Sequence, residues 1–181
     1  MANNAIIPLS EACTFCPRCG KDGGKRDHLI PFVCRHCGFA NYFGPVSAVG
    51  AIVEDGEGGV VMIRRARDPG KGLLGLPGGF IDAGETAEEA AIREVKEEVG
   101  MSVRELRFLT TFPNQYVHHG VVAPVLDLFY VATVQDLNDT ALEATEVSEL
   151  LIVEVGEEHL GQMAFESNRL ALEMYLRLIS E

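Results

Sequence analysis

Short apolar runs separated by polar, glycine-rich turns fill most of the chain beyond residue 45. Runs of this kind, bounded by turn residues, are typical of β-strands. We expect strands over residues 46–53, 60–65, 103–111, 125–134 and 150–155. The first two flank an acidic, glycine-rich turn, so they are predicted to form a hairpin.

Two other segments show helical signals. Thr86 followed by Glu89 forms a capping box, and Gly100 provides the left-handed residue that ends many helices, so a helix is predicted over residues 87–99. A second, amphipathic helix is predicted over residues 165–179 and should cover the core. The residues available for its packing are Leu170, Met174, Leu176 and Leu178.

The first of these helices carries a concentration of acid on one side. At 3.6 residues per turn, Glu94, Glu97 and Glu98 share an arc of about 100°. A neighbouring apolar seam contains Ile92, Val95 and Val99, while the residues expected to point away from both are Glu89, Arg93 and Lys96. Glu94 and Glu98 repel at this spacing by about 0.2–0.5 kcal/mol in water. A divalent cation such as Mg²⁺ or Mn²⁺, which prefers oxygen ligands, would relieve that repulsion.

The segment 79–101 also has a specific spacing of residues. It contains Gly79, then Glu85, then the run Arg93-Glu94-Val95-Lys96-Glu97-Glu98-Val99-Gly100-Met101. This pattern resembles the Nudix box at every defined position. The resemblance implies an α/β fold of the Nudix α/β/α sandwich type, and hydrolysis that depends on Mg²⁺ or Mn²⁺. In that family the positions that bind the metal correspond to Glu94, Glu97 and Glu98.

The resemblance also suggests roles for residues around that set. The position of Glu85 adds to the metal shell or orients it, and that of Arg93 is a structural partner of the acids. Nudix enzymes take their general base from the box or from a glutamate in a late loop. Glu146, in the acidic segment before the last predicted strand, is therefore the loop candidate, with Glu143 as the spare.

Residues 112–120 are expected to form a loop that recognises the substrate. Phe112 and Tyr116 offer ring faces on which a base can stack. Asn114 offers hydrogen bonds to a base edge or ribose. The alternative, that Phe112 packs in the core and the polar residues cap a turn, remains open at this stage.

Charged residues near two predicted strands have two interpretations each. Arg64, Arg65 and Arg67, at the end of the second strand, either point to solvent or contact a substrate phosphate. Asp127 interrupts an apolar strand and is either a buried structural carboxylate, the interpretation we favour, or a site residue.

The five cysteines all lie between residues 13 and 37. The segments 16–20 (CPRCG) and 34–38 (CRHCG) are two C-x-x-C knuckles, each followed by glycine. Paired knuckles predict a structural Zn²⁺ site formed by Cys16, Cys19, Cys34 and Cys37. Cys13 is left as a spare thiol, and His28 and His36 are interpreted as loop residues.

This cysteine segment resembles the zinc ribbon that precedes the catalytic domain of NADH pyrophosphatases. We therefore expect a zinc ribbon over residues 1–45 and a Nudix hydrolase domain over residues 46–181. The resemblance is incomplete, because NADH pyrophosphatases carry a further array with a tryptophan and this chain contains no tryptophan. NADH is therefore not expected to be the preferred substrate.

Charge and hydropathy limit the partners. The formal net charge is −12, with an acidic excess beyond residue 46, which argues against nucleic acid as a partner. The sequence has no run of 18 apolar residues and no basic start followed by an apolar core, so we expect a cytoplasmic protein without a membrane partner. A homodimer remains open.

The leading hypothesis is an enzyme that cleaves the pyrophosphate bond of ADP-ribose, a nucleotide sugar or a dinucleotide. The competing hypothesis is a nucleotide-sensing regulatory module whose zinc ribbon binds nucleic acid or protein. The full set of glutamates in the box favours the enzyme, because loss of a metal ligand would be expected in a sensor.

Overall fold

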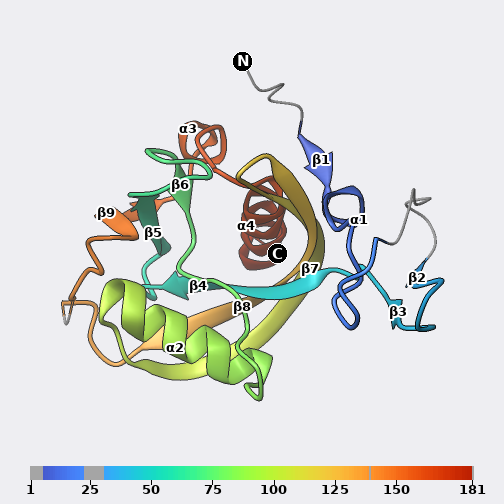
Figure 1. Ribbon diagram of the computed structural model, residues 1–181. Coiled ribbons are helices and arrows are strands. Elements are labelled where there is room, and N and C mark those ends of the chain that lie inside the picture. Colours follow the sequence, from blue (N-terminus) through green and yellow to red (C-terminus); the bar gives the residue numbers. More distant parts are fainter. Residues whose placement is uncertain (1–5, 23–30, 139, 181) are drawn as a thin grey trace. The chain divides into compact units, whose positions relative to one another are not determined.

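The computed structural model describes residues 6–22, 31–138 and 140–180. The chain forms two compact units, one from residues 1–46 with 115–125 and the other from residues 47–114 with 126–181 (Figure 1). The helices are α1 (Leu9–Ala12), α2 (Ala87–Val99), α3 (Glu157–Leu160) and α4 (Glu166–Ile179). The strands are β1 (Ile7–Pro8), β2 (Phe32–Val33), β3 (Ala40–Asn41), β4 (Val46–Glu54), β5 (Gly59–Arg65), β6 (Leu74–Gly75), β7 (Val103–His118), β8 (Val121–Val134) and β9 (Val147–Glu154).

In the second unit, the sheet is built around β4 and β5. The strand order is β8-β4-β5-β6, with β7 paired to β8 and β9 paired to β5. Strands β5 and β9 are antiparallel from Gly59 opposite Glu154 to Arg65 opposite Val147, with a bulge between Arg64 and Arg65. This pairing brings the end of β5 beside the segment that enters β9.

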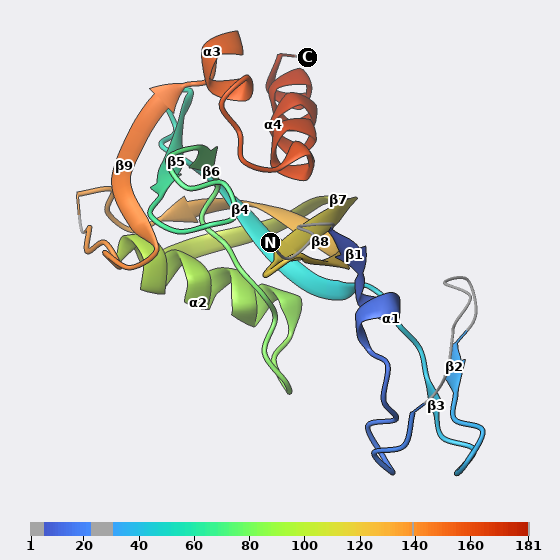
Figure 2. The ribbon, with the colours of Figure 1, turned by 45° about the horizontal axis from the view of Figure 1, so that its top comes forward.

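Helices α2 and α4 lie on opposite faces of this sheet, which Figures 1 and 2 show from two directions. Alternate residues of β4 and β5 point to different helices. Ile52, Val60 and Met62 pack in the cluster that contains Leu172 and Tyr175 of α4. Residues of the same strands on the other face pack with α2 in a second cluster: Ala51, Val53, Val61, Ile63, Val95 and Val99. The predicted α/β/α sandwich is confirmed, and burial on both faces explains why these strands are almost continuously apolar.

Three expectations about individual segments were wrong. Residues 112–118 belong to β7, so the predicted substrate loop is mostly strand, with only a short turn before β8. Helix α4 buries Ser167, Ala171, Leu172 and Tyr175 rather than the four predicted residues. Of those four, Leu176 packs against the core, whereas Leu178 is 48% exposed. On α2, Ile92 is 44% exposed, so the apolar seam narrows to Val95 and Val99.

The first unit contains a small ribbon around the cysteines. Strands β2 and β3 are antiparallel, with Phe32 opposite Asn41 and Val33 opposite Ala40. Its core consists of Cys16, Phe32 and Cys34, against which the partly buried Cys37, Phe39 and Phe43 pack. In the same unit, β1 pairs in parallel with the start of β8.

Among the residues that the structure describes, no helix is long and apolar enough to cross a membrane.

Candidate active site

Helix α2 begins and ends where the sequence predicts. The Thr86 hydroxyl accepts a hydrogen bond from the Glu89 N–H at 3.2 Å, and the Glu89 carboxylate accepts one from the Thr86 N–H at 2.8 Å. The capping box is therefore confirmed. Gly100 ends the helix in the left-handed conformation, with φ 82°. These signals fix the rotation at which the helix presents its glutamates to the sheet.

The two glycines before the box allow a close approach to β4 and α2. A Cβ atom on Gly78 would lie 2.1 Å from the Val49 carbonyl oxygen, and Gly78 has φ 155°. A Cβ atom on Gly79 would lie 2.5 Å from Oε1 of Glu94. Only glycine fits at position 78, where the neighbour is backbone, whereas a side chain at position 79 would displace the Glu94 carboxylate. The Gly78 N–H is thereby directed at Glu98 and donates to its Oε2 at 2.9 Å.

Glu98 is the most buried glutamate of the helix, with 4% of its surface exposed. The pKa of Glu98 is raised to about 8, mainly by burial and also by the neighbouring charges of Glu94 and Glu146, against the opposing effects of the Gly78 N–H and Arg65. Burial also raises the pKa of Glu94, which Arg93 partly offsets. A buried and a partly buried carboxylate that repel each other are a donor set that suits a hard divalent cation.

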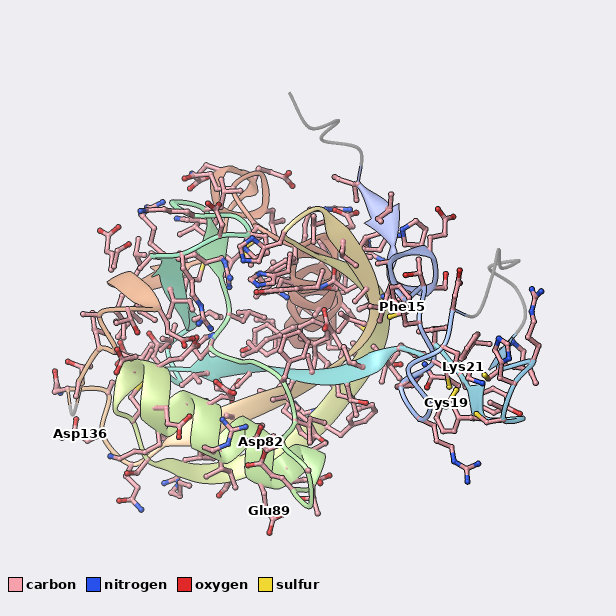
Figure 3. The ribbon with its side chains drawn as sticks, viewed as in Figure 1. Phe15, Cys19, Lys21, Asp82, Glu89 and Asp136 are labelled. Atoms are coloured by element: carbon pink, nitrogen blue, oxygen red, sulfur yellow. The ribbon has the colours of Figure 1, made fainter. Side chains whose placement is uncertain are left out.

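Arg93 connects the other acids of the box. Its Nε and Nη2 donate to the two oxygens of Glu85 at 2.8 and 2.9 Å, and its Nη1 donates to Glu94 at 2.7 Å and to Glu97 at 3.0 Å. The pKa of Glu85 is consequently lowered. The expectation from periodicity that Arg93 points away from the acids was wrong, whereas the partner role implied by the family resemblance agrees with these contacts. Figure 3 shows Asp82 and Glu89 near the first turn of α2.

Glu146 lies next to this set although it is far from it in the sequence. The Glu143 N–H donates to the Glu98 carbonyl at 3.2 Å, and the Ala66 N–H donates to the Glu146 carbonyl at 2.8 Å. These bonds hold the segment before β9 between α2 and the end of β5. The Glu146 carboxylate forms an ion pair with Arg67 at 2.6 Å. Glu143 instead accepts from the Thr145 hydroxyl at 2.8 Å and is exposed.

The residues expected to bind substrate are in different surroundings. Phe112 packs against Phe129, with ring centroids 6.4 Å apart, beside the core that contains α4. This favours the core interpretation of Phe112. Tyr116 belongs to the first unit and stacks on His118 with centroids 6.4 Å apart. A substrate role for either residue stays a prediction.

Asp127 has a structural environment, as we expected. It is 6% exposed and accepts hydrogen bonds from Asn114 Nδ2 at 2.8 Å and from the Ser167 hydroxyl at 2.5 Å. Burial raises the pKa of Asp127. The bonds join β7, β8 and α4, so the Asn114 amide that we predicted to contact substrate supports this buried carboxylate.

The arginines at the end of β5 are held by different partners. Arg64 Nε donates to Glu149 at 2.7 Å and its Nη1 donates to the Gly72 carbonyl at 3.0 Å. Arg65 Nε donates to the Pro69 carbonyl at 2.8 Å, and its guanidinium lies over the Phe165 ring. The role of Arg67 beside Glu146 was not foreseen, although its place in the run Arg64-Arg65-Ala66-Arg67 was a signal.

The four cysteines form the second candidate metal site. The sulfur atoms of Cys16, Cys19, Cys34 and Cys37 all lie within 4.8 Å of one another. Each knuckle turns at a glycine with φ 71°, and the Gly20 and Gly38 N–H groups donate to the carbonyls of Cys16 and Cys34 at 2.8 Å. This is the arrangement expected for Zn²⁺. Figure 3 shows Cys19 among the sulfur atoms of the ribbon.

The structure agrees with leaving Cys13 and His36 out of the predicted ligand set. Cys13 is not part of the group of four, and His36 is exposed. His28 lies outside the described residues. In the part of the chain that the structure describes, the cysteines are the one group of three or more histidine, cysteine or acidic residues gathered to hold a metal ion.

The fold and this site together define an α/β/α sandwich protein with glutamates on one helix beside a double-glycine turn. The chain belongs to the Nudix family, because the profile of the NUDIX domain matches residues 44–172.

Known relatives agree with this assignment. The chain is 36% identical over 105 residues to an ADP-ribose pyrophosphatase of Methanocaldococcus jannaschii, covering 57% of this chain and 62% of that protein. It is 31% identical over 116 residues to the NAD-capped RNA hydrolase NudC of Haemophilus influenzae, covering 62% of this chain and 43% of that protein. The chain therefore spans less than two thirds of these relatives.

A solved structure matches over more of the chain. The crystal structure of a NUDIX hydrolase from Nitrosomonas europaea superimposes with a TM-score of 0.66 at 27% identity. The match covers 91% of this chain and 90% of that one.

Proposed function

We propose that this chain is a hydrolase that uses Mg²⁺ or Mn²⁺ to cleave the pyrophosphate bond of a nucleoside diphosphate linked to another group. The observation that carries the proposal is the contact of Glu94 and Glu98 with the Gly78–Gly79 turn, together with the charge of Glu146, which acts on both carboxylates. Bound there, a divalent cation would activate water and neutralise charge on the phosphates. The donor set supports it, since all three groups offer carboxylate oxygens.

The residues of the site have distinct proposed roles. Glu94, Glu97 and Glu98 hold the metal, and Arg93 fixes Glu85 and Glu94 in orientation. Glu98 or Glu146 accepts the proton of the attacking water. The two glycines lie directly against the carboxylates of Glu94 and Glu98, so this side of the proposed site is bordered by backbone without side chains.

For the substrate, we propose ADP-ribose or a similar nucleotide sugar. The name of the Methanocaldococcus relative supports this choice. The absence of tryptophan argues against NADH, because NADH pyrophosphatases carry a further array that contains a tryptophan. The NudC relatives act on NAD-capped RNA according to their name, so an RNA substrate has to be tested despite the acidic charge of this chain.

The organisation of the chain is part of the same proposal. Residues 1–45 form a zinc ribbon with one structural Zn²⁺, residues 46–181 form the catalytic domain, and the protein acts in the cytoplasm. The clustering of four cysteine sulfurs supports the zinc assignment.

A substrate panel tests the proposal. The purified chain is incubated with Mg²⁺ or Mn²⁺ and, separately, ADP-ribose, a nucleotide sugar, NADH, an NAD-capped oligoribonucleotide and ATP, and kcat/KM is measured for each. We expect ADP-ribose or the nucleotide sugar to give the highest value, and activity to require the divalent cation.

Other outcomes have definite meanings. If NADH or the capped RNA is the best substrate, the substrate assignment is wrong and the ribbon was the better guide. Tight binding of ADP-ribose without any hydrolysis would instead support the nucleotide-sensing module. Loss of hydrolysis in Glu98→Gln would tie the activity to this site and exclude a contaminating enzyme.

A further inference from the structure

Two arginine–glutamate ion pairs join the end of β5 to the segment around the start of β9. Arg64 Nε lies 2.7 Å from Glu149 Oε2, and Arg67 Nη2 lies 2.6 Å from Glu146 Oε2. All four side chains are partly exposed, so neither pair is expected to stabilise the fold strongly. The two pairs are alike in chemistry and distance, although the arginine is the more exposed partner in one pair and the glutamate in the other. Their different surroundings are therefore informative.

Only one of the two pairs adjoins the glutamates of α2. The backbone on either side of the Glu146 carboxylate is tied to the end of β5, through the Ala66 N–H, and to α2, through the Glu143 N–H and the Glu98 carbonyl. The charge of Glu146 acts on both Glu94 and Glu98, whose pKa values it raises. Glu149 is not among the groups that act on either glutamate.

The Arg67 partner restricts what Glu146 can do. When a carboxylate oxygen accepts a hydrogen bond from a guanidinium, that guanidinium competes with a metal ion for the lone pairs of the oxygen. The Arg67 side chain is 56% exposed, so it can move into water at small cost when a stronger partner arrives. A divalent cation beside Glu94 and Glu98 is such a partner, because it carries twice the charge and prefers carboxylate oxygens.

We propose that Arg67 holds Glu146 while the site contains no metal and releases it to a divalent cation bound at Glu94 and Glu98. Arg67 is thus a positioning residue that acts through Glu146. The inference rests on the proposed metal-dependent function. It adds that, when the metal binds, Glu146 exchanges its ion pair with Arg67 for one with the metal.

The exchange predicts the sign of a change in metal affinity. Binding of the cation has to break the Arg67–Glu146 pair, and the positive charge of Arg67 opposes the approach of a cation. Loss of that charge should therefore tighten binding, by about threefold to tenfold for a partly exposed pair. Loss of the Glu146 carboxylate should weaken binding, since the negative charge that Arg67 releases to the cation is removed.

The experiment measures Mn²⁺ affinity by electron paramagnetic resonance, on the full chain with its ribbon zinc retained and without substrate. The variants are Arg67→Gln, Glu146→Gln and the double variant, and the matched controls are Arg64→Gln and Glu149→Gln. We expect Arg67→Gln to tighten Mn²⁺ binding and Glu146→Gln to weaken it about tenfold. In the Glu146→Gln background, Arg67→Gln should have no more effect than Arg64→Gln, because the two residues act as one unit.

The possible results separate this inference from the proposed function. If Mn²⁺ binds the wild-type chain and Glu98→Gln abolishes that binding, the metal site is established independently of Arg67. Unchanged or weaker binding in Arg67→Gln, or an equal gain in Arg64→Gln, would then overturn the exchange alone. Absence of Mn²⁺ binding sensitive to Glu98→Gln would overturn the proposed function itself. Thermal melting of each variant verifies that the fold is retained.

Discussion

The two candidate metal sites of this chain, the cysteine site and the glutamate site, differ in how their side chains are held. The cysteine sulfurs lie within 4.8 Å of one another and come from two short knuckles with the same turn. The glutamates come from α2 and from the segment before β9, and several of them are paired with arginines, Arg93 and Arg67. The cysteine sulfurs surround one common point, whereas several carboxylates of the glutamate site are already paired with arginine side chains.

The difference corresponds to two uses of a metal. A structural zinc ion needs four fixed ligands and no open position, and its binding free energy contributes to folding. A catalytic metal has to leave room for water and substrate, and its carboxylates have to be stable without it. Guanidinium partners serve this purpose, since each compensates a carboxylate charge and can be replaced.

The largest expected effect concerns the glutamate site. Glu98→Gln should lower turnover by at least about a hundredfold, because the change removes a charged oxygen ligand or base while preserving the shape of the side chain. Glu97→Gln should act in the same direction. Steady-state kinetics on the best substrate of the panel, with thermal melting as a check on folding, measures the effect.

Glu89→Gln is the matched control for that change. It lies on the same helix, and glutamine can replace glutamate in a capping box, so turnover should stay near that of the wild type. Near-native turnover in both box variants Glu97→Gln and Glu98→Gln would remove the basis for a catalytic metal here, and the comparison of two metal sites would fail.

The second prediction concerns the cysteine site. Cys34→Ser should release the single bound zinc and loosen the ribbon, since Cys34 is part of the ribbon core as well as a ligand. The Nudix body should stay folded because its clusters do not include the ribbon residues. Elemental analysis gives the zinc content, and hydrogen exchange gives the extent of loosening.

Cys13→Ser is the control, because Cys13 is not part of the group of four. It should retain one zinc per chain. Iron in the purified wild-type protein, or no metal at all, would contradict the structural zinc site, and equal loosening in both variants would show that the effect is not due to the metal.

The comparison also explains how much could be predicted from sequence. The helix bounds, both knuckles and the hairpin β4–β5 follow from short-range rules, namely capping, turn glycines and strand periodicity, and these were predicted correctly. The acidic arc of α2 was located by the same rules. Its arginine partner was misplaced by periodicity, because a long, flexible side chain can curl back over its own helix to reach Glu85.

Features that depend on distant contacts were predicted less well. The hydrogen bond from Asn114 to Asp127 was not predicted, because Asp127 lies on another strand. The substrate role of Asn114 stays a prediction. The pairing of Arg67 with Glu146 was not predicted, because the two residues are brought together by the β5–β9 pairing and the bond from Ala66. The buried face of α4 was rotated from the predicted one, since a helix with apolar residues on several sides has no single seam that the sequence can identify.

The smallest expected effect is the contribution of Glu98 to the pH dependence of thermal stability. In the folded protein without metal, burial raises the pKa of Glu98 from 4.5 to about 8, with help from the charges of Glu94 and Glu146. Between these two pH values the folded chain holds a proton that the unfolded chain has lost. The contribution of Glu98 to the free energy of unfolding is therefore full below the unfolded pKa and falls as the pH rises through that window.

Removal of the carboxylate should flatten this dependence. We expect the melting temperature of the metal-free wild-type body to fall by several degrees between about pH 5 and pH 8.5, and by less in Glu98→Gln, which carries no charge at either pH. Added Mn²⁺ should reduce the fall in the wild type, because a bound cation compensates the charged carboxylate, and should do nothing in the variant. Differential scanning calorimetry measures the melting temperature of both proteins, with and without Mn²⁺, at the two pH values. Equal pH dependence in the two proteins would mean that Glu98 is already ionised in the metal-free fold. Arg65 and the Gly78 N–H, rather than a missing metal, would then stabilise its buried charge.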